Sequence, residues 1–357
     1  MLCILLASAG CTTLGPRYEV PATDTSIAFK EGQGVWQRAV PADAVARGPW
    51  WELFQDPVLN GLASQVEVSN QNVAAAVAAY AQARALTAEQ RASLFPVVSL
   101  DASGNRSGGG GNTPTRGSYQ VSIGASWEPD VWGRLRLGVQ GARASEQATL
   151  ADLASARLSA QGELAVNYFN LREADVQRAL LAETLEGYKR SLQIARNRYN
   201  AGVVARTDLL QAETQLANTQ ADMLTLERQR AQLEHAIAVL VGKAPANFSL
   251  PAQPKWQLHL PDIPEALPST LLQRRPDIAA AERRVEQANT RIGIAQAGYY
   301  PSFRLSGSAG LSAASIGDLF SASALVWSLG ASLAQTIFNA GATGAQVSQA
   351  RAAVEQA

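Results

Sequence analysis

The clearest pattern along the chain is a strict alternation of apolar and polar side chains. From Tyr119 to Glu128 every second residue is apolar, and the residues between them are small or polar. The stretches near 302–312 and 324–337 alternate in the same way, and 97–106 does so more weakly. A period of two is typical of β-strands with one apolar face. We therefore expect four strands, at about 97–106, 118–128, 302–312 and 324–337.

The two faces of these strands differ in a way that favours a membrane. The polar face carries mainly Gly and Ser, whereas a soluble sandwich, the alternative, would fill its inner face with large side chains. Strands of ~9–11 residues are long enough to cross the hydrocarbon of a bilayer. The positions expected to face lipid are Tyr119, Val121, Ile123, Trp127, Phe303, Leu305, Leu325, Trp327 and Leu329.

The number of strands bears on assembly. A bilayer tolerates no open sheet edge, and the smallest spanning barrels have about eight strands. Four strands from one chain therefore predict an oligomer.

A second pattern, with a period of seven, occupies the middle of the chain. Residues 135–200 contain no proline, and as a single helix their ~66 residues would reach ~99 Å. Apolar residues recur every seven positions there and again over 209–240, interrupted only by Arg178 and Arg230. Such spacing predicts two helices that pair as an antiparallel coiled coil over about 135–241. Gly202 should end the first helix and Asp208 should cap the second.

The turn between these helices is a candidate docking site for another protein. It would expose a tight tip at the end of a long hairpin, although helix capping alone explains Gly202 and Asp208 equally well. The residues of this candidate tip are Arg198, Tyr199, Gly202, Thr207, Asp208 and Leu209.

An internal repeat organises the sequence at an offset of 205 residues, which indicates duplication. With one further residue of offset, Trp127 and Trp132 align with Leu333 and Phe338. The aligned positions before them are Leu62, Val73, Ala76, Ala83, Pro96 and Leu100 with Leu267, Ile278, Ala281, Ala288, Pro301 and Leu305. The second copy lacks a counterpart of the long hairpin, so we expect a chain cut short by roughly a hundred residues.

The N-terminus resembles a bacterial secretion signal. Leu2 to Gly10 is a short apolar stretch that ends in small residues before Cys11, so residues 1–10 are expected to be a signal peptide and Cys11 a lipidation site. Ser8 stands where lipoproteins usually have Leu, and no Lys or Arg precedes the apolar stretch, which suggests a start further upstream. Cys3 and Cys11 are the two cysteines of the chain, which excludes disulfides and thiolate metal sites elsewhere.

Composition narrows the function further. Thirty basic and thirty acidic residues balance, so charge gives no indication of a nucleic-acid partner. The chain has no phosphate-binding glycine loop, and His235 and His259 lack metal-ligand spacing, so neither an enzyme nor a cofactor is expected.

Several motifs follow one another in the order of a known family. They are GPRYEVP at 15–21, WWELFQDPVLNGL at 50–62, SWEPDVWGRLR at 126–136, LLQRRPDIAAAE at 271–282 and IGIAQAGYYPSFRLSG at 292–307. With them the chain resembles the outer membrane factors, the TolC-like channels, and most closely the lipid-anchored OprM and NodT branch. The stretch RYNAGVVARTDLLQAE at 198–213 is similar to the hairpin tip of that family.

The resemblance implies a mixed α and β membrane protein. Four strands per chain would contribute to a twelve-stranded barrel in a homotrimer, and the helices would form a long α-helical coiled-coil barrel through the periplasm. The implied location is the outer membrane, with Cys11 in its lipid. The tip would meet a periplasmic adaptor beneath an inner-membrane pump. In this family the gate residues come largely from the second hairpin, so none is assigned here.

The expected organisation and function follow from these patterns together. After the signal peptide come a lipid-anchored segment at 11–56, a first structural repeat at 57–242, a Pro-rich linker at 243–268 and an incomplete second repeat at 269–357. We expect a passive exit channel for drugs or metal ions in a tripartite efflux system driven by a resistance-nodulation-division pump. The alternatives are the outer-membrane channel of a type I protein secretion system and a periplasmic coiled-coil scaffold without a pore.

Overall fold

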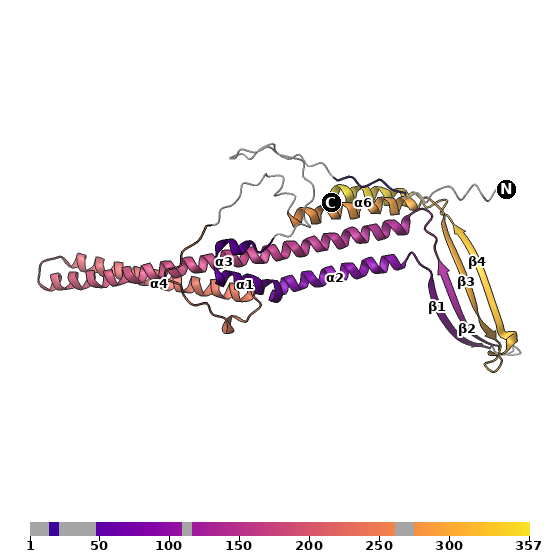
Figure 1. Cartoon of the computed structure of the whole chain (residues 1–357), viewed down its shortest axis with the longest axis horizontal. Helices are drawn as coiled ribbons and strands as arrows, with labels where there is room; N and C mark the ends of the chain where they lie inside the picture. The colour runs from indigo at the N-terminus through magenta and orange to yellow at the C-terminus, as the bar shows by residue number, and fades with distance from the viewer. Residues whose placement is uncertain (1–13, 21–47, 109–115, 261–274) are drawn as a thin grey trace. The chain divides into compact units, whose positions relative to one another are not determined.

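The computed structural model describes residues 14–20, 48–108, 116–260 and 275–357. The chain divides into two compact units, each built from separate stretches of sequence. The sheet unit comprises residues 1–24, 80–150 and 278–357, and the hairpin unit comprises residues 25–79 and 151–277. Helices α2 (Gln71–Ala92) and α3 (Arg134–Asn200), labelled in Figure 1, contribute long stretches to both units.

The sheet unit contains one antiparallel sheet of four strands in the order β1-β2-β3-β4 (Figure 1). The strands are β1 (Val97–Ser107), β2 (Arg116–Trp127), β3 (Ser302–Ala313) and β4 (Leu325–Ala334). The mixed α and β architecture with four strands is therefore confirmed. The last strand ends at Ala334 and does not reach 337, because its partner β3 begins at Ser302, which lies opposite Ala334.

The helices of the sheet unit flank its strands in sequence. Helix α6 (Pro276–Ala297) precedes β3 and α7 (Ala342–Gln356) follows β4, just as α2 precedes β1 and α3 follows β2. A short 3₁₀ helix, η3 (Ala322–Ala324), lies in the β3–β4 connection. Helices α2 and α6 both have 22 residues and differ by 205 positions at both ends, the spacing of the sequence repeat.

A short N-terminal segment, Leu14–Val20, lies along α6. The Tyr18 hydroxyl donates a hydrogen bond to the carbonyl of Glu282 (3.4 Å), and the Asn289 side chain donates to the carbonyl of Pro16 (3.0 Å). Next to these hydrogen bonds the backbones of Gly15 and Gly293 lie close together. A Cβ added to Gly15 would lie 3.0 Å from the Cα of Gly293. Only glycine permits this approach at both positions.

The hairpin unit holds a continuous hydrophobic core. Its elements are the 3₁₀ helices η1 (Trp50–Phe54) and η2 (Pro245–Asn247), helix α1 (Pro57–Ser69), helix α4 (Arg206–Leu240), and the parts of α2 and α3 assigned to it. The buried members are Trp51, Leu59, Leu62, Ala63, Val66, Val73, Leu153, Ala160, Leu164, Ala165, Tyr168, Leu171, Ile237, Leu240, Val241 and Leu250. Asp56 is the N-cap residue of α1. Its carboxylate accepts hydrogen bonds from the N–H groups of Val58 and Leu59 in the first turn of the helix.

The long hairpin follows its heptad pattern. Helix α3 is 67 residues long, and the heptad positions of α4, such as Thr219 and Leu226, are buried between exposed neighbours. Ion pairs join the two helices at Arg178–Glu227 (3.5 Å) and Arg196–Glu213 (3.3 Å), which fits an antiparallel arrangement.

The two arginines that interrupt the heptads have separate roles. Arg178 forms the exposed pair with Glu227. Arg230 donates to Asp175 (2.7 Å) and to the carbonyl of Leu250 (2.6 Å). Asp175 also accepts from the fully buried Arg172 (2.9 Å), so a charged cluster ties α3, α4 and the residues after η2 together.

No helix in the described ranges has both the length and the apolar character that a membrane-spanning helix needs.

Candidate functional site

The register of the sheet places most of its large apolar side chains on one face. Directly opposed residues share a face, and each apolar position of one strand lies opposite an apolar or small position of the next. Leu100 pairs with Ile123, Val121 with Leu311 and Phe303 with Leu333. All nine positions expected to face lipid lie on this apolar face: Tyr119, Val121, Ile123, Trp127, Phe303, Leu305, Leu325, Trp327 and Leu329.

The opposite face is lined mainly by serine and glycine. Ser99 pairs with Gly124, and Ser308 lies opposite Ser328, whose hydroxyl is 2.8 Å away. Asp101 and Arg304 are charged members of this polar face. Hydroxyls and exposed backbone give such a surface high affinity for water and little bulk, which suits the wall of an aqueous passage.

Both edges of the sheet are open. Among the described residues β1 pairs only with β2 and β4 only with β3, so each edge strand leaves a row of backbone N–H and C=O groups without partners in this sheet. The apolar side chains on β4 are largely exposed, Trp327 to 75% and Leu329 to 83%. A surface of this kind requires both a nonpolar solvent and further strands.

The hairpin tip is closed by a compact hydrogen-bonded turn. The N–H of Val203 donates to the carbonyl of Arg198 and the N–H of Gly202 donates to that of Tyr199, both at 2.9 Å. With Gly202 at φ +73° this is a Schellman motif, which needs the left-handed conformation that glycine adopts freely.

The expectation that Asp208 caps α4 is wrong. The helix begins at Arg206 after Ala205, whose side chain makes no capping bond. Asp208 lies in the first turn, where its charge favours the positive end of the helix without a capping hydrogen bond. The Schellman turn uses residues 198–203, and the helix begins at Arg206, three residues earlier than an N-cap at Asp208 would place its start.

The tip brings the six candidate residues into one short stretch and adds two that the sequence reasoning missed. Val203 is 64% exposed and Leu210 is 48% exposed, so the tip carries apolar surface beside Arg198 and Arg206. Leu210 lies off the heptad positions, and that placement was a readable signal of an outward-facing apolar residue.

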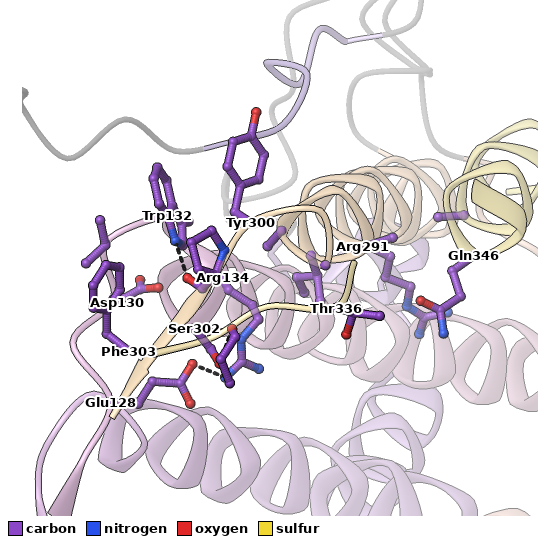
Figure 2. A pocket seen from close by; sticks show the side chains of 18 of the residues that line it. Glu128, Asp130, Trp132, Arg134, Arg291, Tyr300, Ser302, Phe303, Thr336 and Gln346 are labelled. Atoms are coloured by element: carbon purple, nitrogen blue, oxygen red, sulfur yellow. Dashed lines mark hydrogen bonds and ion pairs between the residues drawn. The ribbon is translucent and has the colours of Figure 1, made fainter. Parts of the chain in front are cut away.

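A cavity of about 570 Å³ lies where the strands of the sheet unit meet its helices. Figure 2 shows one ion pair in its lining: Arg134 reaches Glu128, with a nitrogen–oxygen distance of 2.6 Å. Asp130 pairs with Arg136 at 3.1 Å and also accepts the N–H groups of Leu135 and Arg136, which stabilises the start of α3. The carboxylates of Glu128 and Asp130 are thus each paired with an arginine.

Aromatic side chains close one side of this junction. The indole of Trp132 lies against the ring of Tyr300, with centroids 4.9 Å apart, and donates to the carbonyl of Pro301 at 2.7 Å (Figure 2). This contact joins the segment that follows β2 to the start of β3. Sequence reasoning aligned Trp132 in the repeat but did not foresee its partner.

Cys11, the expected lipidation site, lies outside the described residues. Within the described ranges no three His, Cys, Asp or Glu side chains gather closely enough to hold a metal ion.

The comparisons with known proteins agree on one family. The family model described as "Outer membrane efflux protein" matches residues 62–243 and 267–357. The solvent efflux pump outer membrane protein SrpC of Pseudomonas putida is 31% identical over 348 residues, which cover 94% of this chain and 73% of SrpC. The cation efflux system protein CusC of Escherichia coli K12 is 29% identical, over 95% of this chain and 74% of CusC.

Solved structures are similar over nearly the whole chain. The outer-membrane channel OprN has 32% identity and a TM-score of 0.82, covering 97% of this chain and 78% of OprN. The MtrE outer membrane channel of Neisseria gonorrhoeae, in its open state, has 30% identity and a TM-score of 0.84, with 97% and 77% covered.

Proposed function

The chain belongs to the outer membrane efflux protein family, and from that premise we propose that it is the exit duct of a tripartite efflux system. It is a channel protein of the outer membrane and not an enzyme. The proposed cargo is small molecules, drugs or metal ions, since relatives are named for antibiotic, toluene, solvent and cation efflux. The proposed driving force comes from a resistance-nodulation-division pump in the inner membrane.

The observation that carries this proposal is the two-faced sheet. An apolar face over all four strands suits lipid, and a serine- and glycine-rich face suits a water-filled lumen. A soluble scaffold would gain nothing from exposing Trp327 and Leu329. Passive conduction needs no catalytic group, only a polar wall and a partner that supplies energy.

We propose a homotrimer. Four strands leave two open edges, and about eight strands are the minimum for a spanning barrel, so at least two chains must combine. Three chains give the twelve strands that the resemblance implies. The helices of three such chains would continue the lumen as a helical tunnel through the periplasm, with the repeats at 57–242 and 269–357 as its building blocks.

A lipid anchor at Cys11 agrees with the path of the chain. The N–H of Leu14 donates to the carbonyl of Trp132 (3.3 Å), at the junction where the strands end. Three peptide steps keep the Cα of Cys11 within about 11 Å of the Cα of Leu14. A lipid on Cys11 would therefore reach the same level as the ends of the strands, the expected boundary of the membrane.

The hairpin tip is the proposed docking site for a periplasmic adaptor. Its exposed surface combines basic charge at Arg198 and Arg206 with the apolar side chains of Val203 and Leu210. Desolvated apolar groups beside arginine are typical of protein interfaces. Tyr199, Thr207, Asp208 and Leu209 complete the proposed contact surface.

Export in living cells tests the function. The gene, with the genes of its adaptor and pump, is placed in a strain without outer-membrane efflux channels, and drug or metal tolerance is measured. Restored tolerance supports the efflux proposal. Secretion of a protein toxin through an ABC exporter without restored tolerance would support the type I alternative, and absence of conductance in planar bilayers would favour the scaffold.

The tip is tested in the same strain. Arg198→Glu together with Asp208→Ala should abolish tolerance, because the adaptor loses its charge contacts, while the oligomer on gels stays unchanged. Arg228→Glu is the matched control, since Arg228 is exposed on α4 away from the tip and bonds to Gln232 on the same helix. Equal tolerance in the two variants would remove the docking proposal.

A further inference from the structure

An arginine groove lies between α2 and α3, on the side of the sheet unit where these helices lead into the strands. Its volume is about 470 Å³, and all of its lining residues belong to the sheet unit. Helix α2 contributes Arg84, Thr87 and Arg91, and α3 contributes Arg143 and Glu146. As far as the structure describes the chain, the charged lining of this groove is thus three arginines and one glutamate.

The three guanidinium groups are not neutralised within the described ranges. None of them takes part in a hydrogen bond or an ion pair there. Near the start of α3, by contrast, Arg134 is paired with Glu128 and Arg136 with Asp130. Like charges gathered without counter-charges repel one another, so a bound anion would lower the electrostatic energy of the groove.

The antiparallel course of the two helices directs two of these arginines towards each other. The Thr87 hydroxyl donates to the carbonyl of Ala142 at 3.2 Å, so these two positions lie at the same level. Arg91 lies one turn nearer to the sheet than Thr87, and Arg143 directly follows Ala142. Helical side chains lean towards the N-terminus of their own helix, which is away from the sheet on α2 and towards it on α3. Arg91 and Arg143 therefore approach the level of Thr87 from opposite directions.

The internal repeat identifies the face of the helices on which the groove lies. At the offset of 205, Arg84 and Ala88 of the groove correspond to Asn289 and Gly293 of α6. Both of these α6 residues contact the N-terminal segment Leu14–Val20. The arginine groove is therefore the counterpart, in the first repeat, of the face that holds the N-terminal segment in the second.

Arg291 lies on the opposite face and provides a comparison. It is two residues from both Asn289 and Gly293, which at ~3.6 residues per turn places it on the other side of α6. There it lines a separate groove of about 390 Å³ together with residues of α2 and α3. Arg291 is exposed and, within the described part of the chain, has neither a hydrogen bond nor an ion pair. The sheet unit thus offers an unpaired arginine on each face.

We propose that the arginine groove binds the phosphate headgroup of an anionic phospholipid from the periplasmic leaflet of the outer membrane. From Thr87 to the end of α2 at Ala92 the helix rises ~7.5 Å. The strands proposed to span the membrane begin shortly afterwards, at Val97. The groove therefore lies within about 8–10 Å of the headgroup layer, the distance over which an anionic surface attracts basic side chains.

The chemistry and the face of the groove both agree with this ligand. A phosphate accepts charge-assisted hydrogen bonds from two guanidinium groups at once, which fits the approach of Arg91 and Arg143. A lipid on Cys11 would enter the bilayer from outside the barrel, and Leu14–Val20 lies on the face equivalent to that of the groove. This inference rests on the proposed channel and anchor, and adds to them a specific contact with membrane lipid.

Lipid binding by the full protein tests the site. The detergent-solubilised protein is titrated with phosphatidylglycerol or phosphatidylcholine, and bound lipid is counted by native mass spectrometry. Phosphatidylglycerol should bind more tightly. Arg143→Gln should weaken its binding about fivefold, and Arg91→Gln with Arg143→Gln about 25-fold, since an arginine near an anionic lipid contributes about a factor of five.

Two further variants serve as controls. Arg291→Gln removes an equivalent charge from the opposite face and should leave phosphatidylglycerol binding unchanged. Arg91→Lys with Arg143→Lys keeps both charges and should retain most of the binding, which separates a lost charge from a folding defect. Equal binding by Arg143→Gln and Arg291→Gln, or equal affinity of the unmodified protein for the two lipids, would overturn the site and leave the arginines as solvated surface charges.

Inorganic phosphate is the probe for the source of the anion. Inorganic phosphate at the same concentration as the lipid should not displace phosphatidylglycerol, because the free ion lacks the membrane that holds the lipid beside the groove. Complete displacement would show that the groove takes free phosphate and would overturn the lipid as its ligand.

Ion selectivity in planar bilayers distinguishes the outer face from the lumen. Arg143→Glu should leave the selectivity between anions and cations unchanged, whereas Arg291→Glu, on the opposite face, should shift it towards cations. A shift in Arg143→Glu would place the groove in the lumen and overturn the lipid proposal.

The proposed function and this site fail separately. A protein that conducts and restores export without preferring phosphatidylglycerol would keep the function and lose the site. A protein that binds phosphatidylglycerol through Arg91 and Arg143 but forms no channel would keep the site and lose the function.

Discussion

The hairpin unit and the sheet are both rich in apolar residues but use them differently. In the hairpin unit Leu59, Leu164 and Ile237 have no exposed surface, and even the guanidinium of Arg172 is fully buried. In the sheet Leu325, Trp327 and Leu329 are 64%, 75% and 83% exposed. The hairpin unit is stabilised by contacts within its own chain, whereas the sheet leaves the apolar side chains of β4 exposed.

This difference in exposure predicts which property a substitution in each region should change. Burial of apolar surface contributes ~25 cal/mol per Å² wherever water is excluded, whether by the same chain or by a bilayer. Changes in the core of the hairpin unit should therefore lower stability in any solvent. Changes on the apolar face of the sheet should act only through the membrane and the oligomer.

The largest expected effect is in the charged cluster of the hairpin unit. Asp175 accepts hydrogen bonds from Arg172, Arg230 and the N–H of Gln253. Asp175→Ala should cost about 3–5 kcal/mol, because two guanidinium groups lose their buried counter-charge. Unfolding of the detergent-solubilised protein in urea, followed by circular dichroism, measures the change.

The control for this prediction is an exposed ion pair on the same helix. Glu186 and Lys189 pair at 2.7 Å on the surface of α3. Glu186→Ala should leave the unfolding curve unchanged, because solvent screens such a pair. A loss of stability in Glu186→Ala as large as in Asp175→Ala would contradict the special role of the buried cluster.

The next largest effect is expected from placing a charge on the apolar face of the sheet instead of the polar face. Leu329→Arg should destabilise insertion by about 2–4 kcal/mol, because the charge would face the hydrocarbon in mid-strand. Ser328→Arg, one residue earlier on the polar face, should assemble normally and change single-channel conductance. Heat stability of the oligomer and planar-bilayer recordings distinguish the two. Equal assembly of both variants would show that the faces are assigned incorrectly.

Two glycines share a left-handed backbone conformation but differ in how closely other atoms surround them. Substituting each by alanine therefore distinguishes the cost of backbone strain from the cost of steric overlap. Gly202 and Gly242 have φ +73° and +69°, and both end a long helix in a Schellman turn. Gly202→Ala should cost about 1–2 kcal/mol from left-handed strain alone, since no atom lies within 4 Å of the added Cβ. Gly242→Ala should cost about 1–3 kcal/mol more, because its Cβ would overlap the carbonyl of Ser69. Equal losses in urea unfolding would argue against the close packing of α1 on this turn.

The smallest expected effect depends on pH. Burial opposes ionisation of Asp56, but hydrogen bonds from Tyr168 (2.7 Å) and Trp256 (3.0 Å) and from the start of α1 outweigh it, so its pKa lies below the usual value. A lowered folded-state pKa adds stability above the unfolded-state value of about 3.9, and this stability is lost as the pH falls through the folded-state pKa.

The measurement compares melting temperatures from about pH 6 to about pH 2.5. The protein should lose more stability over this range than the variant Asp56→Asn, whose amide does not titrate. Parallel melting curves for the two proteins would contradict the role of the Asp56 carboxylate.

The sheet was the most predictable part of the fold, for a physical reason. A strand with one apolar face repeats every two residues, so the positions of the apolar face, such as Ile123 and Trp327, could be read directly from the alternation. The heptads of the hairpin were equally readable. The start of α4 was not, because the residue before it, Ala205, makes no side-chain capping bond, so no capping residue type marks the boundary.

The interruptions of the heptads show a second limit. Arg178 and Arg230 look alike in sequence, yet one is an exposed pair and the other belongs to a buried cluster. The difference depends on Asp175, which lies 55 positions from Arg230, and on the carbonyl of Leu250. Partners so distant in sequence follow from the tertiary fold and not from local pattern.

The N-terminal segment along α6 has a consequence for the order of folding. Its hydrogen bonds join residues 264 and 273 positions apart, from Tyr18 to Glu282 and from Pro16 to Asn289. This segment is synthesised before the helix that receives it, by 264 residues in the case of Tyr18 and Glu282. Contacts of such long sequence separation carry a large loop-closure cost and form late. The segment Leu14–Val20 should thus dock only after α6 has been synthesised, as a late step in the folding of the sheet unit.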